Sequence, residues 1–138
     1  MRITLCGSTR FMEAFGDWNV ILTKAGHVVY TVAQSSHGAH EPNAEEKRRF
    51  DLVHLAKIDA SDAIVVLNVD GYIGESTLRE IEWARLRRKD VYWLNHAIPG
   101  QVLGVSIWQI YNLFEDRPIR SMSETVKYGE GKRTLNHD

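Results

Sequence analysis

Residues 62 to 69, "DAIVVLNV", form a continuous apolar run in which β-branched side chains are frequent. A run of this kind predicts a strand that is buried on both faces, as the strands of a parallel sheet are. The next stretch, "DGYIGESTLREIEWA" at 70 to 84, holds a glycine-containing loop and then a helical pattern that continues to about residue 88. Strand, loop and helix in this order form one repeating unit of an α/β fold.

The rest of the chain repeats this alternation. Further strands are expected at 2 to 6, 27 to 32 and 91 to 94, and further helices at about 8 to 26, 43 to 57 and 104 to 114. Phe50, Val53 and Leu55 are the candidates for the packed face of the helix at 43 to 57. We therefore predict a flavodoxin-like or Rossmann-like α/β fold, with a parallel sheet of four to five strands and helices on both faces.

The composition is that of an ordinary globular protein. We expect residues 1 to 138 to form a single domain, with 115 to 138 as an extended or frayed tail. The formal net charge of -1 gives no support to a nucleic-acid or membrane partner. Cys6 is the single cysteine, so no internal disulfide forms. The apolar stretch near the N-terminus is too short for a signal peptide, and we expect a cytoplasmic location.

Two unusual loops are predicted to meet at one edge of the sheet. In parallel α/β folds, ligands bind beyond the carboxyl ends of the strands. The connections expected at that edge are residues 7 to 11, 33 to 43 and 69 to 76, and they include the stretches "GSTRF" and "GYIGEST". We therefore expect a ligand site where these two stretches converge.

The stretch "GSTRF" has the residue types of an anion or sugar site. Backbone N–H groups at a helix N-terminus attract anions, and a glycine permits close approach of a ligand. Hydroxyl groups and a guanidinium can bind phosphate or sugar hydroxyls. The candidate ligand-binding residues are Gly7, Ser8, Thr9, Arg10 and Phe11. The alternative is a helix cap followed by a surface arginine.

Glu80 has two interpretations on the local sequence. In the first, "TLRE" at 77 to 80 is a capping box in which Thr77 caps the helix and Glu80 bonds back to it. In the second, Glu80 points into the crevice and attacks an anomeric carbon, whose transition state is cationic. Neighbouring backbone amides would then keep Glu80 ionised. Tyr72, in the glycine loop, could stack on a base or could simply be a loop residue.

The segment "DLVHLAKIDASD" at 51 to 62 supplies the candidates for acid–base work. His54 and Asp59 are possible proton donors, although the end of a helix lies at the wrong edge of a parallel sheet. The other five histidines show no metal-ligand spacing with each other or with Cys6, so no metal is expected. Cys6 itself is interpreted as a packed strand residue.

Three stretches together resemble the nucleoside 2-deoxyribosyltransferase family, including its nucleoside 5'-monophosphate N-glycosidase branch. They are "ITLCGSTRF" at 3 to 11, "KIDASDAIVVLNV" at 57 to 69 and "GYIGESTLREIEWA" at 71 to 84, and the resemblance covers roughly residues 2 to 94. Against the family pattern D-x-G-T-x-x-E-hydrophobic-G-Y-A, Glu80 takes the place of the nucleophile. Direct matches are found at Thr77, Ile81 and Ala84.

The chain also departs from the family pattern. Gly74 stands where the family has an acid, although Glu75 is adjacent, and Glu82 replaces a family glycine. A second family carboxylate falls on His54, with Asp51 and Asp59 a short step away. By resemblance, the glycine loop adds candidate substrate-binding residues, namely Tyr72, Gly74, Glu75 and Ser76.

The resemblance implies cleavage or transfer at the N-glycosidic bond of a (deoxy)nucleoside or its 5'-monophosphate, through a covalent glycosyl–Glu80 intermediate. It implies no cofactor, and a homodimer or larger oligomer in which a neighbour completes the site. Two other functions stay open. One is a non-catalytic nucleotide sensor. The other is a flavodoxin-like FMN-dependent reductase, because "GSTR" after a first strand also resembles the phosphate loop of flavoproteins.

Overall fold

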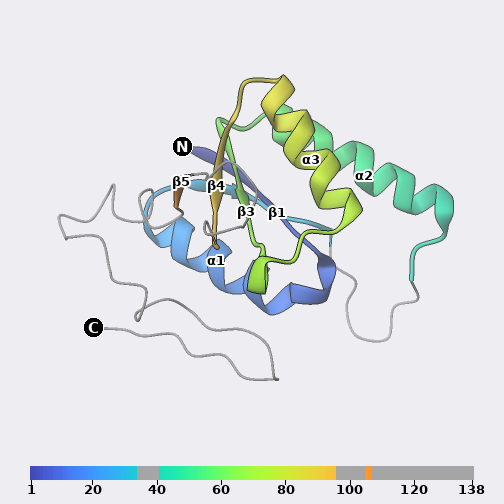
Figure 1. The fold of residues 1–138 in the computed structure, drawn as a ribbon, viewed down its shortest axis with the longest axis horizontal. Coiled ribbons are helices and arrows are strands. Elements are labelled where there is room, and N and C mark those ends of the chain that lie inside the picture. Colours follow the sequence, from blue (N-terminus) through green and yellow to red (C-terminus); the bar gives the residue numbers. More distant parts are fainter. Residues whose placement is uncertain (34–40, 96–104, 107–138) are drawn as a thin grey trace.

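The run at 62 to 69 contains the central strand, residues 63 to 66, of a five-stranded parallel sheet in the computed structural model, which describes residues 1–33, 41–95 and 105–106. The strand order is β2-β1-β3-β4-β5 (Figure 1). The strands are β1 (Arg2–Cys6), β2 (Val28–Tyr30), β3 (Ala63–Val66), β4 (Asp90–Trp93) and β5 (Val105–Ser106). The helices are α1 (Met12–Lys24), α2 (Ala44–Asp59) and α3 (Glu75–Leu86), with short 3-10 helices at Thr9–Phe11 and Val69–Gly71. The predicted parallel α/β sheet is confirmed.

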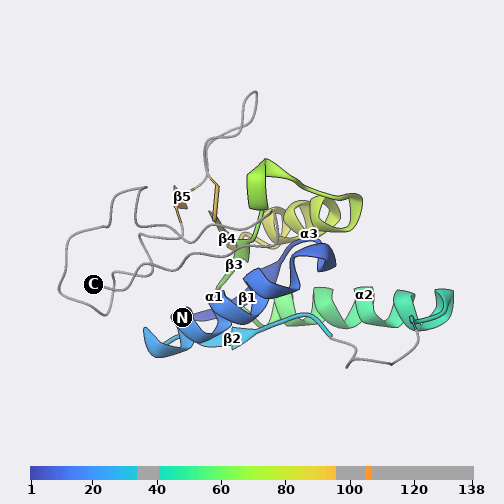
Figure 2. The same ribbon diagram turned by 90° about the horizontal axis from the view of Figure 1, so that it is seen from below.

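Helices cover both faces of the sheet, as predicted. Helix α1 lies on one face, and α2 and α3 lie side by side on the other (Figures 1 and 2). Alternate residues of one strand therefore enter different cores: Leu5 packs in the cluster that includes α1, whereas Cys6 packs in the cluster that includes α2 and α3. Every residue of β3 is buried, because this strand lies between β1 and β4 and under both helical layers. This position explains its unbroken apolar sequence.

The strand order places a topological switch point between β1 and β3. After β1 the chain crosses to α1 on one face, and after β3 it crosses to α3 on the opposite face. In doubly wound folds with this strand order, the two connections separate at the carboxyl edge and leave room for a ligand. None of the described helices is long and apolar enough to cross a membrane.

One predicted element differs from the structure. We expected a helix at 104 to 114, but residues 105 and 106 form the strand β5 instead. There Val105 pairs with Tyr92, and Ser106 pairs with Trp93. The backbone hydrogen bonds that the free edge of β4 offers outweigh the helical pattern at this point. Residues 107 to 114 lie outside the described part of the chain, as do 34 to 40 of the long loop and the tail at 115 to 138.

The packed face of α2 also differs from the prediction. Phe50 and Val53 are 45% and 54% exposed, so assigning them to the packed face was wrong. The buried or half-buried stripe runs instead through Asp51, His54, Leu55 and Ile58, which are spaced by three and four residues. Because the helix presents this stripe to the sheet and to α3, it carries polar groups inward toward the end of β1.

Candidate active site

The two loops that the sequence predicted to converge do meet at the carboxyl edge. The guanidinium carbon of Arg10 lies 4.2 Å from the ring centroid of Tyr72, within cation–π distance. The ring of Phe11 meets the same tyrosine edge-on, with centroids 6.0 Å apart. Ser8 caps the short helix at Thr9–Phe11, where its Oγ accepts a hydrogen bond from the Arg10 N–H at 3.3 Å. Ser8 is therefore a helix cap, as one interpretation expects, and Arg10 stacks on the facing loop. Ligand binding by this stretch stays a prediction.

Gly7 has a packing role at this edge. A Cβ placed on it would lie 3.1 Å from the carbonyl oxygen of Leu67, closer than ordinary contacts allow. The Leu67 N–H donates to the Cys6 carbonyl at 2.8 Å, which holds the ends of β1 and β3 together. Gly7 thus permits the close approach of the two strand ends that form the floor of the switch point.

The capping-box interpretation of Glu80 is wrong. Helix α3 begins at Glu75, with Gly74 as its N-cap in an extended conformation and without a side-chain cap. Thr77 is therefore the third helical residue, and it is buried rather than capping. The Leu78 N–H donates to the Gly74 carbonyl at 3.0 Å, which closes the first helical turn three residues earlier than the pattern predicted. Glu80 lies in the second turn, free of any capping role.

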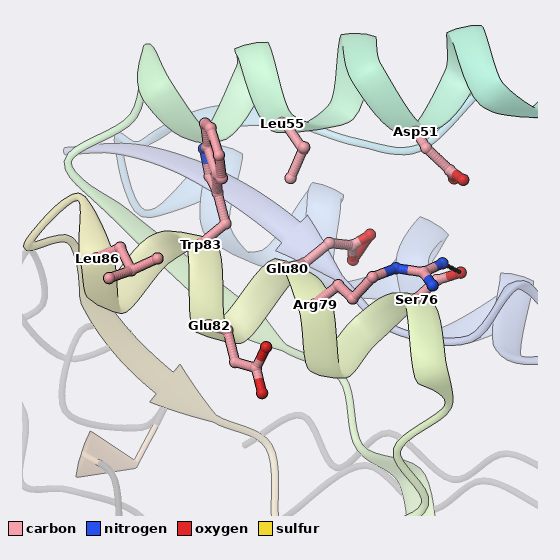
Figure 3. Close-up of a pocket in the computed structure, with 8 residues that line it drawn as sticks. All are labelled: Asp51, Leu55, Ser76, Arg79, Glu80, Glu82, Trp83 and Leu86. Carbon is pink, nitrogen blue, oxygen red and sulfur yellow. Dashed lines mark hydrogen bonds between the residues drawn. The ribbon is translucent and has the colours of Figure 1, made fainter.

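Glu80 points from α3 toward α2 and the end of β1 (Figure 3). Its side chain is only 14% exposed. Its Oε1 lies 3.7 Å from His54 Nε2, and that nitrogen lies 3.5 Å from the Sγ of Cys6. Oε1 has no hydrogen-bond partner within the described residues. A carboxylate from α3, an imidazole from α2 and a thiol from β1 therefore share one buried position.

Burial changes the protonation of all three groups. It raises the pKa of Glu80 to about 8, with a further increase from Asp51, while the Cys6 thiol and Arg79 act in the opposite direction. Burial and then Lys57 lower the pKa of His54 to about 4, although Asp51 opposes this. Burial, followed by the charge of Glu80, raises the pKa of Cys6. At neutral pH the three groups are therefore mainly uncharged.

The expectation that backbone amides keep Glu80 ionised is thus wrong. In the second turn of a helix the amides already donate to the backbone carbonyls of the preceding turn. The carboxyl group gains no compensation from them, and the loss of solvation decides its pKa.

A pocket of about 250 Å³ opens between α2 and α3, and Glu80 forms part of its wall (Figure 3). Its lining residues are Asp51, Leu55, Ser76, Arg79, Glu80, Glu82, Trp83 and Leu86. Asp51 and Leu55 point from α2 toward α3, and Trp83 points back toward α2. Arg79 donates to the Ser76 hydroxyl at 3.2 Å, and this places a cation at the same end as Asp51. The pocket therefore has an apolar end and a charged end.

The structure brings some predicted site residues to this pocket and not others. Glu80 and Ser76 line the pocket, and His54 lies against Glu80. The "GSTRF" residues and Tyr72 form the neighbouring loop contact and do not line it. Gly74 and Glu75 form the start of α3.

Asp59 is not brought to the pocket. Its Oδ1 accepts a hydrogen bond from Trp83 Nε1 at 3.0 Å and lies 3.7 Å from Arg87 Nε. Asp51 is the carboxylate of α2 that lines the pocket, and it lies one helical turn before His54 on the same stripe. Helical spacing from His54 was the sequence signal that could have identified it.

Comparison with known proteins supports the fold. No protein-family model and no curated protein matches the chain. A 2-deoxyribosyltransferase from Bacillus psychrosaccharolyticus has a similar structure, with a TM-score of 0.56 and 16% identity over 86% of this chain and 93% of that one. The CMP N-glycosidase of Clostridium botulinum has a TM-score of 0.46 and 18% identity over 67% of this chain and 70% of that one. A conserved protein from Enterococcus faecalis has a TM-score of 0.46 and 19% identity over 67% of this chain and 62% of that one. The first of these confirms the sequence resemblance at the level of the fold: this chain has the fold of a bacterial 2-deoxyribosyltransferase.

Proposed function

We propose that the protein cleaves or transfers the N-glycosidic bond of a (deoxy)nucleoside or its 5'-monophosphate, with Glu80 as the nucleophile. One observation carries the proposal: Glu80 has no capping role, holds an unpartnered oxygen and borders a pocket. The volume of about 250 Å³ is close to the lower end of small-molecule sites, roughly 300 to 1,000 Å³. The fold shared with a 2-deoxyribosyltransferase supports the same reaction class.

The chemistry follows from charge. As the bond between C1' and the base breaks, its electron pair leaves with the base and the sugar becomes cationic. An ionised Glu80 oxygen forms a bond to C1' and gives a glycosyl ester. Asp51 adds a second negative charge beside the developing cation. Attack on C1' by water or by a second base then releases Glu80. The protein is a hydrolase if water attacks and a transferase if a second base attacks.

The proton balance limits the role of His54. Glu80 is mainly protonated at neutral pH, so it must lose its proton before it attacks. The imidazolium of His54, with a pKa of about 4, is a stronger acid than the carboxyl of Glu80, with a pKa of about 8, so the proton leaves Glu80 for solvent and not for His54. The departing base takes its proton from solvent water. Neutral His54 lies beside the carboxylate, with Nε2 3.7 Å from Oε1, and we assign it a positioning role.

Release of free base tests the proposal. The protein is incubated with deoxynucleosides, ribonucleosides and their 5'-monophosphates, with and without an acceptor base, and free base is followed by chromatography. Glu80→Gln should lower the rate by roughly 10⁴-fold or more, as loss of a nucleophile does. The matched control is Glu45→Gln, which makes the same chemical change on α2 at an exposed position that does not line the pocket. Intact-mass analysis with a slow substrate analogue should detect a sugar adduct on Glu80.

Two outcomes would contradict the proposal. One is the absence of base release from every substrate class. The other is undiminished turnover by Glu80→Gln.

A further inference from the structure

Cys6, His54 and Glu80 form a cluster with the composition of a metal site. They come from the end of β1, the middle of α2 and the second turn of α3. One ligand-type atom from each lies within 4.8 Å of the other two. Thiolate, imidazole and carboxylate are the three side-chain groups that zinc binds in proteins. The sequence gives no sign of this cluster, because Cys6 and His54 are 48 residues apart.

The distances suit a tetrahedral ion. Bonds of about 2.3 Å to sulfur and about 2.0 to 2.2 Å to nitrogen and oxygen place neighbouring ligand atoms about 3.3 to 3.6 Å apart. The observed separations are 3.5 Å between Cys6 Sγ and His54 Nε2, and 3.7 Å between His54 Nε2 and Glu80 Oε1. The third separation, between the Cys6 sulfur and a Glu80 carboxylate oxygen, is at most 4.8 Å. A shift of up to about 1.2 Å would therefore complete three corners of a tetrahedron.

The surroundings also favour a cation. Glu80 Oε1 is buried and has no hydrogen-bond partner within the described residues, so coordination would satisfy an atom that is otherwise costly to bury. Asp51 adds a negative charge that acts on Glu80 more strongly than the positive charge of Arg79 does, although Lys57 acts on His54. Glu80 also lines the pocket between α2 and α3, so the cluster lies next to a cavity.

We propose that Cys6, His54 and Glu80 bind a zinc ion or a similar thiophilic divalent cation. A sulfur ligand disfavours magnesium and calcium, which prefer all-oxygen sites. Binding converts the thiol to a thiolate and Glu80 to a carboxylate and releases their protons to solvent, so the two negative charges balance the dication. The consequence rests on the proposed function: an ion on Glu80 occupies the oxygen that would attack C1', so the metal inhibits the enzyme reversibly.

Cobalt provides the direct test of binding. The protein is stripped with a chelator, dialysed and titrated with Co²⁺. Because Cys6 is the single cysteine, any thiolate-to-cobalt charge-transfer band must come from it. Zn²⁺ should then displace the cobalt and abolish the band, and competition with a chromophoric chelator gives the zinc affinity.

The variants remove one ligand at a time. His54→Gln, Glu80→Gln and Cys6→Ser should each weaken zinc binding by about 100-fold or more, since even partners outside the first ligand shell cost 10- to 100-fold. Glu45→Gln, at an exposed position that does not line the pocket, should bind zinc as the wild type does. Circular dichroism checks that each variant folds, and Cys6→Ser keeps the side-chain volume almost unchanged.

Each result bears on the proposal. A cobalt band that needs all three residues supports it. The absence of a band, or a band that persists in both His54→Gln and Glu80→Gln, overturns it. This readout needs no substrate, so it stands even if the protein releases no base. Conversely, base release by a protein that shows no cobalt band would support the proposed function and refute the metal site. Inhibition by Zn²⁺ that a chelator reverses tests the consequence.

Discussion

The buried carboxyl of Glu80 predicts a specific dependence of stability on pH. Its pKa is about 8 in the folded protein against 4.5 for an ordinary glutamate. The folded state therefore holds this proton more tightly than the unfolded chain does. The stability that results is fully present below about pH 4.5 and is lost as the pH rises through about 8. A difference of about 3.5 pKa units corresponds to about 5 kcal/mol.

Replacement of Glu80 by glutamine isolates this contribution. The amide resembles the protonated carboxyl in shape and cannot ionise, so the variant should not lose this stability at high pH. Relative to the wild type, Glu80→Gln should gain about 5 kcal/mol of unfolding free energy between about pH 4 and about pH 9. Because His54 is present in both proteins, its own titration largely cancels in the difference.

Urea unfolding at a series of pH values, with a chelator present, measures the effect. Glu82→Gln is the control, and the wild-type pH dependence should persist in it because Glu80 is intact. A gain of less than about 1.5 kcal/mol across the range would refute the reasoning, since it would mean that the carboxyl ionises in the fold almost as it does in the unfolded chain.

Three further predictions concern the pocket and the two loops at the carboxyl edge of the sheet. In the presence of a chelator, the rate of base release should increase as the pH rises toward about 8. Asp51→Asn should move this increase to lower pH, because the substitution removes a charge that raises the pKa of Glu80. A pH–rate profile that does not move would contradict this reasoning. Arg10→Ala should raise KM for 5'-monophosphates at least tenfold more than KM for nucleosides, if its guanidinium binds phosphate as well as stacking on the loop; equal changes would remove the phosphate role. Gly7→Ala should cost about 1 to 3 kcal/mol of unfolding free energy, because its Cβ would crowd the Leu67 carbonyl; a midpoint in urea equal to that of the wild type would show that the loop relaxes.

The sheet was predictable from local pattern. The unbroken apolar run in β3 can only be accommodated where both faces are covered, and this requirement led directly to a parallel sheet between helical layers. The convergence of the two loops followed from the same reasoning, because parallel strands deliver their carboxyl ends to one edge. The contact between Arg10 and Tyr72 confirms it.

The details of the site depended on features that local pattern does not carry. The sequence around Thr77 matches a capping box, yet the helix begins at Glu75, because Gly74 in an extended conformation is its N-cap and closes the first turn earlier. Asp51 and Asp59 both lie close to His54 in the sequence, so spacing did not separate them. The packing of α2 against α3 places Asp51 at the pocket and Asp59 in a hydrogen bond with Trp83.

Local sequence patterns were enough to predict the α/β fold, the edge at which the loops meet and the candidacy of Glu80. The burial of Glu80 beside His54 and Cys6, and the high pKa that follows from this burial, became visible only in the folded chain. The physical reason is that solvation and distance are properties of several elements together. The thiol, imidazole and carboxylate come from β1, α2 and α3, and they meet only because the two helices lie side by side over the end of that strand.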